Sequence, residues 1–357
     1  MPSTTDRLSA RGSSPRASLL ALVLPALSGV ACFHATPALR VNQVGYYPER
    51  VKVAVVETES STPLAWSVVD AKGQAVARGQ TELQGSDPVS GQTLHWVDFS
   101  EVHQPGRGYR VVVDADTSFP FDIDASIYRR LKYDALRYFY YNRSGIPIAL
   151  PFALDFKWTR PPGHLSDAEV GCYGEPCPYK LDVTGGWYDA GDHGKYVVNG
   201  GISAWTLQNL YERTQQLGTS LGDFADGKLG IPESGNGASD LLDEARFEVE
   251  FLLKMQVPEG QERAGMAHHK VHDTTWTMLG LTPATYSESR YLHRPSTAAT
   301  LNLAATAAQA SRLWREQDPA FADRCLLAAK RAWNAAQRFP RDFASAMDNN
   351  GGGPYDD

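Results

Sequence analysis

The hydrophobic pattern of this chain changes near Asp124, and that change constrains the fold more than any other feature. Over residues 39–123, short runs of β-branched and aromatic residues are separated by turn signals rich in Gly and Pro. After Asp124, apolar residues recur at the three- and four-residue spacing of amphipathic helices. We therefore expect two domains, of which the first is all-β and the second all-α.

The first segment predicts a β-sandwich of immunoglobulin type. The clearest strand patterns, each bounded by turn residues, are 51–56, 66–69, 94–99 and 109–113. No Cys–Trp–Cys spacing of an antibody domain is present, so the prediction concerns architecture only. No residue of this segment suggests chemistry, and taken alone it is typical of a structural or adhesion module.

The second segment predicts a series of helices with no strands between them, as in an all-α toroid or bundle. The expected helices are 126–141, 201–216, 239–256, 296–315 and 321–338, the last preceded by Asp318 as N-cap and Pro319. Residues 142–195 form a long irregular stretch between the first two. A loop of this length inside a compact domain is usually functional.

The N-terminus is typical of an exported protein. Basic residues precede an apolar run at 17–27, which is followed by small residues and Cys32. This order predicts a secretory signal peptide and leader over residues 1–38, with a disordered apolar tail as the alternative. Cys32 is a candidate for lipidation, although Gly29 stands where a lipoprotein signal usually has Leu. We expect a secreted, periplasmic or cell-surface protein.

Composition and cysteine spacing narrow the class further. A net charge of −7 argues against a nucleic-acid binder. The sequence contains no internal run of 18 apolar residues, so we expect no membrane-spanning helix. Cys172 and Cys177 lie in a loop rich in Gly and Pro, where an exported protein favours a disulfide. Zinc is the weaker interpretation, because no further ligand pairs follow at zinc spacing. Cys325 lies in a helical pattern and is interpreted as a small core residue.

Residues 185–196, Gly-Gly-Trp-Tyr-Asp-Ala-Gly-Asp-His-Gly-Lys-Tyr, are the sharpest candidate site. Its glycines disfavour a helix and suit a loop that approaches a ligand closely. Asp189 and Asp192 alone would be typical of a solvated turn. Aromatic neighbours change that interpretation, because sugar rings stack on aromatic faces while their hydroxyls bind carboxylates. Such a site could hold a water between a carboxylate base and an anomeric carbon.

This segment strongly resembles the signature of family 9 glycoside hydrolases, the inverting cellulases. Residues 39–46 resemble the start of the immunoglobulin-like module that precedes many of their catalytic domains. Further matching segments are 231–237, 242–245, 252–256, 268–271 with Trp276, and 296–303. The similarity extends from Leu39 to the last residue.

The resemblance implies a fold and a reaction. Residues 124–357 would form the N-terminal portion of an (α/α)6 barrel that hydrolyses β-1,4-glucosidic bonds of cellulose or cellodextrins without a cofactor. Asp192 would be the general base, and Asp189 would help to hold the water and orient the base. Their titration would be coupled, because the two carboxylates lie close together.

The resemblance also implies residues in or near the substrate cleft: Trp187, Tyr188, His193, His269, His272 and Trp276. For the histidines and Trp276 a packing role stays equally open, since buried aromatics are ordinary core residues. Calcium sites are common in the family, and the oxygen ligands Glu233, Asn236, Asp240 and Asp243 lie close together in sequence. Helix capping by Asp240 and a solvated acidic face would explain the same residues.

The general acid of the family is a Glu far downstream, whereas this sequence ends at Asp357 after about half of the twelve helices. Glu244, Glu248 and Glu250 are expected on a solvated helix face, and nothing marks them as acids. We therefore expect the fragment alone to be inactive and poorly stable. The alternatives are a non-catalytic glucan-binding or adhesion protein and a helical-toroid hydrolase of another polysaccharide.

Overall fold

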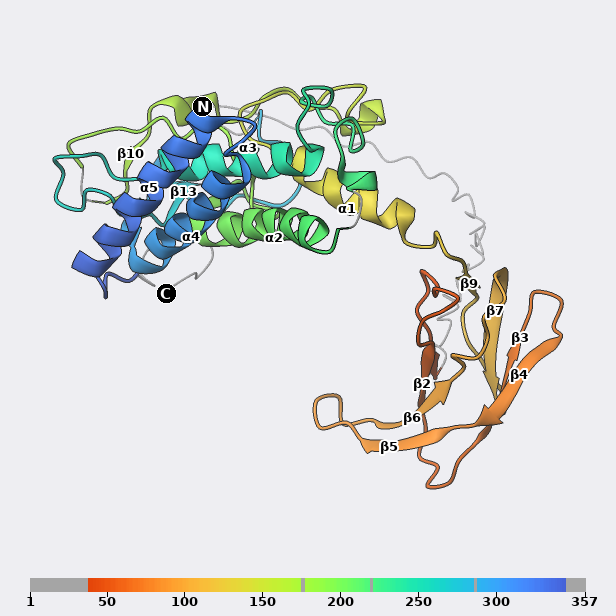
Figure 1. Cartoon of the computed structure of the whole chain (residues 1–357). Coiled ribbons are helices and arrows are strands. Elements are labelled where there is room, and N and C mark those ends of the chain that lie inside the picture. The colour runs from red at the N-terminus through yellow and green to blue at the C-terminus, as the bar shows by residue number, and fades with distance from the viewer. Residues whose placement is uncertain (1–37, 175–176, 219–220, 286–287, 345–357) are drawn as a thin grey trace, which may run out of the picture. The chain divides into compact units, whose positions relative to one another are not determined.

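A computed structural model of the chain describes residues 38–174, 177–218, 221–285 and 288–344 (Figure 1). The chain divides into two compact units whose boundary falls between Ile127 and Tyr128. The expected signal peptide and Cys32 lie outside the described residues. Within the described residues, none of the helices combines the length and the apolar character that a membrane span requires.

From residue 38 onward, where the structure describes it, the first unit consists of two antiparallel sheets (Figure 1). One contains, in spatial order, β1 (Leu39–Arg40), β2 (Val53–Glu57), β6 (Thr93–Asp98) and β5 (Glu82–Ser86). The other contains β4 (Ala75–Gln80), β3 (Ala65–Val69), β7 (Gly106–Val113) and β8 (Asp116–Thr117), and β9 (Phe121–Ile123) also pairs with β7. The four strand patterns read from the sequence correspond to β2, β3, β6 and β7.

The core of the first unit lies between these sheets. Ala54 and Val97 come from the first sheet, Val68 and Val111 from the second, and all four are buried in one cluster. Alternate residues of each strand face this cluster, as a half-buried strand requires. The immunoglobulin-like sandwich expected from the sequence is therefore the observed architecture.

In the part of the chain that the structure describes, five helices form the framework of the second unit (Figure 1). They are α1 (Arg129–Tyr141), α2 (Val197–Gln216), α3 (Asp240–Lys254), α4 (Thr297–Leu313) and α5 (Pro319–Arg338). Helix α2 packs against α3 and α4, and α4 packs against α5. The Asp318 side chain accepts the Phe321 N–H at the start of α5, which is the predicted N-cap.

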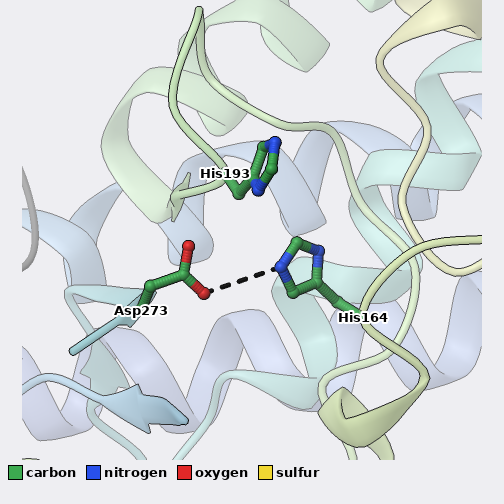
Figure 2. A group of neighbouring side chains, drawn as sticks. All are labelled: His164, His193 and Asp273. Atoms are coloured by element: carbon green, nitrogen blue, oxygen red, sulfur yellow. Dashed lines mark ion pairs between the residues drawn. The ribbon is translucent and has the colours of Figure 1, made fainter. Parts of the chain in front are cut away.

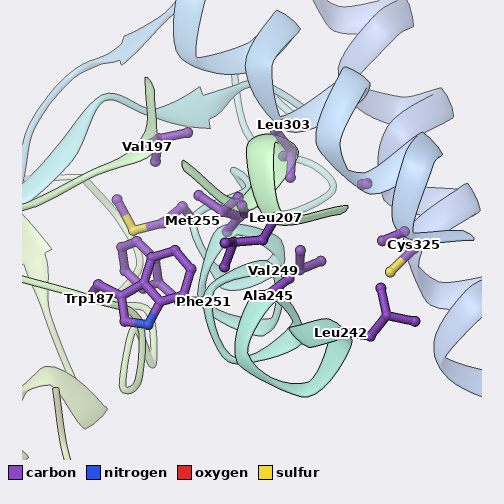
Figure 3. Close-up of a cluster of buried hydrophobic side chains, with 14 of the residues drawn as sticks. Trp187, Val197, Leu207, Leu242, Ala245, Val249, Phe251, Met255, Leu303 and Cys325 are labelled. Atoms are coloured by element: carbon purple, nitrogen blue, oxygen red, sulfur yellow. The ribbon is translucent and has the colours of Figure 1, made fainter. Parts of the chain in front are cut away.

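Apolar side chains from the loops and helices meet in one core (Figure 3). Trp187, Leu207, Phe251 and Leu303 are all buried in it. Cys325 of α5 is fully buried as well, and burial raises the pKa of its thiol to about 12. It is therefore a core residue, as its helical position suggested.

The expectation that no strands separate the helices was wrong. Strands β10 (Gly171–Cys172), β14 (Arg290–Leu292), β13 (Lys270–Asp273) and β11 (Lys195–Tyr196) form one small sheet, and β12 (Ala267–His268) pairs with β15 (Pro295–Ser296). Strands this short carry no readable alternation. Their pairing brings β13 beside β11, directly after the glycine-rich segment.

The long stretch between α1 and α2 is otherwise irregular. It contains the short 3₁₀ helices η1 (Phe156–Trp158) and η2 (Leu165–Ala168), and a third, η3 (Gly222–Phe224), follows α2. Cys172 and Cys177 form a disulfide with an Sγ–Sγ distance of 2.08 Å, which closes a short loop in this stretch.

Candidate active site

Residues 185–194 form a loop that reaches β11 and then α2. Gly186 has a φ of 74°, and a Cβ at this position would lie 2.5 Å from Cγ of Phe251. Glycine is therefore required here, because the backbone both adopts a left-handed conformation and presses against α3. Within the loop, the Asp189 N–H donates to the Gly194 carbonyl over 2.9 Å. This bond closes a turn that holds both aspartates.

Asp192 is buried in this turn. Its Oδ2 accepts hydrogen bonds from the Gly194 N–H at 3.1 Å, the Tyr196 hydroxyl at 3.0 Å and His272 Nε2 at 3.1 Å. Among the described residues, none donates a hydrogen bond to its Oδ1. Burial alone would raise the pKa of Asp192, but His272, Tyr196 and the Gly194 amide together lower it below its usual value. The carboxylate is thus ionised at neutral pH.

Asp189 is only partly buried. Its Oδ1 accepts a hydrogen bond of 2.9 Å from Nδ2 of Asn199, in the first turn of α2. The carboxylate lines a small pocket together with aromatic and polar side chains: Tyr138, Phe139, Asn142, Trp187, Tyr188, Tyr196, Asn199 and Ser203. The loop and the start of α2 therefore position Asp189 jointly.

The aromatic residues predicted to bind substrate occupy different environments. Trp187 is buried, and its ring lies 4.6 Å from that of Phe139. Tyr188 is also buried, with its hydroxyl 2.7 Å from Nδ1 of His164. By contrast, Trp276 is 45% exposed and stacks on the ring of His272 at a centroid distance of 6.0 Å. Trp276 thus presents an accessible aromatic face near Asp192, whereas Trp187 and Tyr188 belong mainly to the core.

The three histidines predicted to lie near the substrate also occupy different environments. His272 of β13 binds Asp192 directly. His193 is buried, and burial followed by the neighbouring His164 lowers its pKa to about 4. His269 is buried, and its carbonyl accepts the Val197 N–H at the start of α2. Of the three, the structure brings His272 into contact with the aspartate pair.

A buried ionic network behind the loop was missed by the sequence analysis. Arg290 donates to both oxygens of Asp167 and, through Nη1, to Oδ1 of Asp273 at 3.0 Å and the His193 carbonyl at 2.8 Å. Lys195 Nζ lies 2.7 Å from Oδ2 of Asp167. The network therefore fixes the loop backbone next to Asp192. Because its members are far apart in sequence, no local sequence pattern indicated the network.

His164, His193 and Asp273 form the group in the described residues that could hold a metal ion, with candidate ligand atoms within 4.8 Å of one another (Figure 2). Imidazole nitrogens with a carboxylate suit a transition metal such as zinc. However, Oδ1 of Asp273 also accepts a hydrogen bond from Arg290. This guanidinium already neutralises the carboxylate and would repel a bound cation, so the group fits a metal poorly as it stands.

Three of the four residues considered for calcium accept hydrogen bonds from protein donors instead. Glu233 pairs with Arg143 over 2.8 and 3.1 Å. Asp240 accepts from two backbone amides and a serine hydroxyl, and Asn236 accepts from the Ala238 N–H. Asp243 has one oxygen without a hydrogen-bond partner among the described residues. Burial raises its pKa to about 6. Oxygens that already accept N–H and O–H groups do not fit a calcium shell.

The expectation that Glu244 and Glu248 lie on a solvated face was wrong, because both are fully buried on α3. Glu244 accepts hydrogen bonds from Arg143 and from Nε1 of Trp187. Glu248 accepts the Trp187 N–H at 2.7 Å. Both side chains therefore bind the segment that leads into the aspartate pair.

Comparisons with known proteins place this geometry in a family. Residues 128–357 match the model of glycosyl hydrolase family 9, and residues 34–118 match that of the cellulase N-terminal Ig-like domain. A cellulose 1,4-beta-cellobiosidase of Acetivibrio thermocellus is 48% identical over 346 residues, covering 90% of this chain and 39% of that protein. Endoglucanase C of Cellulomonas fimi is 49% identical over 335 residues, covering 90% and 30%. The chain thus spans less than half the length of either relative.

Solved structures support the same family assignment. A metagenome-derived family 9 endoglucanase superposes with a TM-score of 0.76 at 34% identity, covering 89% of this chain and 58% of the other. The family 9 protein of Bacteroides ovatus gives 0.73 at 34% identity, covering 87% and 55%. The predicted fold class, an immunoglobulin-like sandwich followed by a catalytic domain of (α/α)6 type, is confirmed. With its N-terminal Ig-like unit and its glycine-framed aspartate pair, this chain belongs to glycosyl hydrolase family 9.

Proposed function

We propose that the protein hydrolyses β-1,4-glucosidic bonds of cellulose or cellodextrins with inversion, and that Asp192 is the general base. The arrangement of Asp192 carries this proposal. Three donors hold its Oδ2, and no described residue donates to its Oδ1. The exposed ring of Trp276 stacks on His272, which is one of these three donors. The names of two relatives, an endoglucanase and a cellobiosidase, support a β-1,4-glucan as substrate.

In the proposed reaction, Oδ1 of Asp192 accepts a proton from a water molecule. The water oxygen forms a bond to the anomeric carbon on the face opposite the leaving group, and the glycosidic bond breaks. A separate acid protonates the departing oxygen, so that charge and atoms balance. Asp189, held by Asn199, would orient the water. The lowered pKa of Asp192 suits this role, because the base must be ionised before attack.

The acid itself is not one of the buried glutamates. Glu244 is occupied by Arg143 and Trp187, and Glu248 is enclosed beneath the loop. Neither can reach a glycosidic oxygen. That the 357-residue chain alone is inactive on cellulose stays a prediction. It is tested by comparing this chain with a C-terminally extended form on carboxymethylcellulose.

The base can be tested without the acid. The leaving group of 2,4-dinitrophenyl β-cellobioside departs unprotonated, so its hydrolysis needs only the water-activating half of the site. We expect the 357-residue chain to release dinitrophenolate and, by proton NMR, to form α-cellobiose first. Asp192→Asn should reduce the rate about 10²- to 10⁴-fold. The matched control Asp182→Asn, an exposed aspartate before the loop, should not. Initial formation of β-cellobiose would refute inversion.

Two alternative functions predict different results in binding and hydrolysis assays. A non-catalytic glucan-binding protein would bind cellohexaose in calorimetry yet leave the activated glycoside intact. A hydrolase of another polysaccharide would prefer a different member of a substrate panel. Xyloglucan belongs in that panel, because a relative from Bacteroides ovatus, 35% identical, is named a xyloglucan-specific endo-beta-1,4-glucanase.

The observed hydrogen bonds disfavour the structural calcium ion that was expected at Glu233, Asn236, Asp240 and Asp243. It would show as a fall in melting temperature when EDTA is added, and we expect no change. Export, with or without a lipid on Cys32, is supported by the Cys172–Cys177 disulfide, since such bonds persist in oxidising compartments. Fractionation of expressing cells and the mass of the mature N-terminus test both points.

A further inference from the structure

The Gly186–Trp187 segment rests on one face of α3. Glu244, Glu248 and Phe251 are spaced at four and three residues, so their side chains lie along the same side of the helix. Glu244 Oε1 accepts the indole N–H of Trp187 at 2.9 Å, and Glu248 Oε2 accepts its backbone N–H at 2.7 Å. Phe251 packs against Gly186 so closely that a Cβ there would not fit. Helix α3 thus holds both the backbone and the side chain of the residue two positions before Asp189.

Glu248 has a second contact that Glu244 lacks. A Cβ on Gly200 would lie 2.0 Å from Oε1 of Glu248, so the carboxyl group packs directly against the first turn of α2. The preceding residue, Asn199, is the one that donates to Asp189. One carboxyl group therefore touches both segments that fix Asp189, the loop before it and the helix that binds it.

The contact is enclosed and polar. Glu248 is fully buried, and its Oε1 has no hydrogen-bond partner among the described residues. The charged groups around it are Lys195 of β11, Glu244 on α3 and Asp189 in the loop. Burial comes first among the causes that raise its pKa to about 8. At neutral pH the group is thus largely a neutral carboxylic acid, which has the shape of a glutamine side chain.

The geometry points to Glu248 as a positioning residue for Asp189, acting through the Trp187 N–H on one side and Gly200–Asn199 on the other. This inference rests on the proposed function, in which Asp189 orients the attacking water. A misplacement of about 1 Å at a reacting group can cost about 100-fold in rate. Loss of the Glu248 contacts should therefore slow turnover without weakening the binding of a glucan chain.

Three variants separate this role from a general effect on folding. Glu248→Gln keeps the shape and an oxygen acceptor for the Trp187 N–H, whereas Glu248→Ala removes both contacts. Glu250→Ala is the matched control on the same helix, where Glu250 pairs with Arg324 at the surface. For each variant, kcat on 2,4-dinitrophenyl β-cellobioside, the Kd for cellotetraose and the melting temperature are measured.

We expect Glu248→Ala to lower kcat about 100-fold with an unchanged Kd, and Glu248→Gln and Glu250→Ala to stay within about threefold of the wild type. Rescue by Gln with failure of Ala supports positioning. A kcat for Glu248→Ala close to that of the wild type, or an equal loss in all three variants, overturns it.

A second readout keeps the inference separate from the proposed function. If the wild-type chain hydrolyses nothing, the proposed function fails, and amide hydrogen exchange at Trp187 and Gly194 still decides the positioning role. Protection lost at these two amides in Glu248→Ala, but kept in Glu248→Gln and in the core of α4, supports it. Unchanged protection at both amides overturns it.

Discussion

Nε2 of His272 lies 3.1 Å from Oδ2 of Asp192, although the two residues are separated by 80 positions in the chain. The pairing of β11 with β13 makes this contact, because it sets Tyr196 beside Lys270 and so brings the rest of β13 under the loop. Nδ1 of the same ring lies 3.1 Å from the Asp273 carbonyl. The imidazole is therefore held at one nitrogen by its own strand and presents the other to the carboxylate.

This contact predicts a shift in pH dependence. Burial raises the pKa of Asp192, and His272 is the first of the groups that lower it again. His272→Ala should therefore raise that pKa and move the acidic limb of the kcat/KM profile on the activated cellobioside to higher pH. Tyr196→Phe removes a weaker influence and should move the limb less. An acidic limb that stays in place in His272→Ala would contradict the assignment of Asp192 as base.

The buried Asp167 predicts an acid-sensitive contribution to stability. Lys195 and Arg290 outweigh the effect of burial and lower its pKa from 3.8 to about 2. A group with a lowered pKa in the folded state stabilises fully above its unfolded pKa and loses that contribution as the pH falls through the folded value. Asp167 should thus contribute about 2 kcal/mol above pH 4 that is lost toward pH 2.

Asp167→Asn tests this point. Removing one partner of a buried ion pair costs about 3 to 5 kcal/mol, because the remaining charges are left uncompensated. Urea unfolding at pH 7 should show a loss of this size, and the gap to the wild type should narrow as the pH is lowered from 4 toward 2. Glu169→Gln, an exposed residue nearby that pairs with Lys180, is the control and should have little effect. A gap that does not depend on pH would contradict the pKa of Asp167.

Substitution of the two tryptophans near the aspartates should affect different properties, namely glucan binding for one and stability for the other. Trp276→Ala removes an exposed ring and is expected to weaken cellotetraose binding several-fold, since ring contacts contribute about 1 kcal/mol, with an unchanged melting temperature. Trp187→Ala removes a buried ring and should cost about 3 to 5 kcal/mol of stability. Calorimetry and thermal unfolding measure these effects. Equal Kd values for Trp276→Ala and the wild type would exclude Trp276 as a sugar platform.

Helices and strands in which apolar residues recur at a regular spacing were predictable from the sequence. The long helices α3, α4 and α5 were expected within a few residues of their bounds, because each buries a regular apolar stripe. Strands β4 and β5 were missed, since they are largely exposed and carry few apolar residues. The six short strands that the structure describes in the second unit were missed for a different reason. They are defined by pairing between distant segments, which a single sequence does not display.

The site was predictable only in part. Glycines and aspartates of one loop identified its location, because their spacing is local. The environment of each side chain was not predictable, and Trp187 and Glu248 illustrate this. An aromatic residue beside the aspartates suggested a sugar platform, and a glutamate on a helix suggested a solvated face. Both are instead buried against each other, a result of how the loop packs on α3.

Glu248 also predicts that stability falls as the pH rises between the unfolded and the folded pKa of this group. Its pKa is raised from 4.5 to about 8, mainly by burial. A group with a raised pKa contributes its full stability below the unfolded value and loses it as the pH rises through the folded value. Between these values the folded state retains a proton that the unfolded state has released. Stability should therefore fall by up to about 1.4 kcal/mol per pH unit from this group alone.

Glu248→Gln cannot ionise and should lack this slope. Its melting temperature, compared with that of the wild type, should become steadily more favourable between pH 5 and pH 8. Glu250→Gln, at the surface of the same helix, should follow the wild type throughout. Parallel curves for Glu248→Gln and the wild type would show that Glu248 is already ionised in the folded protein. A buried carboxylate would then stand beside Asp189, and Lys195 would be the cation that compensates it.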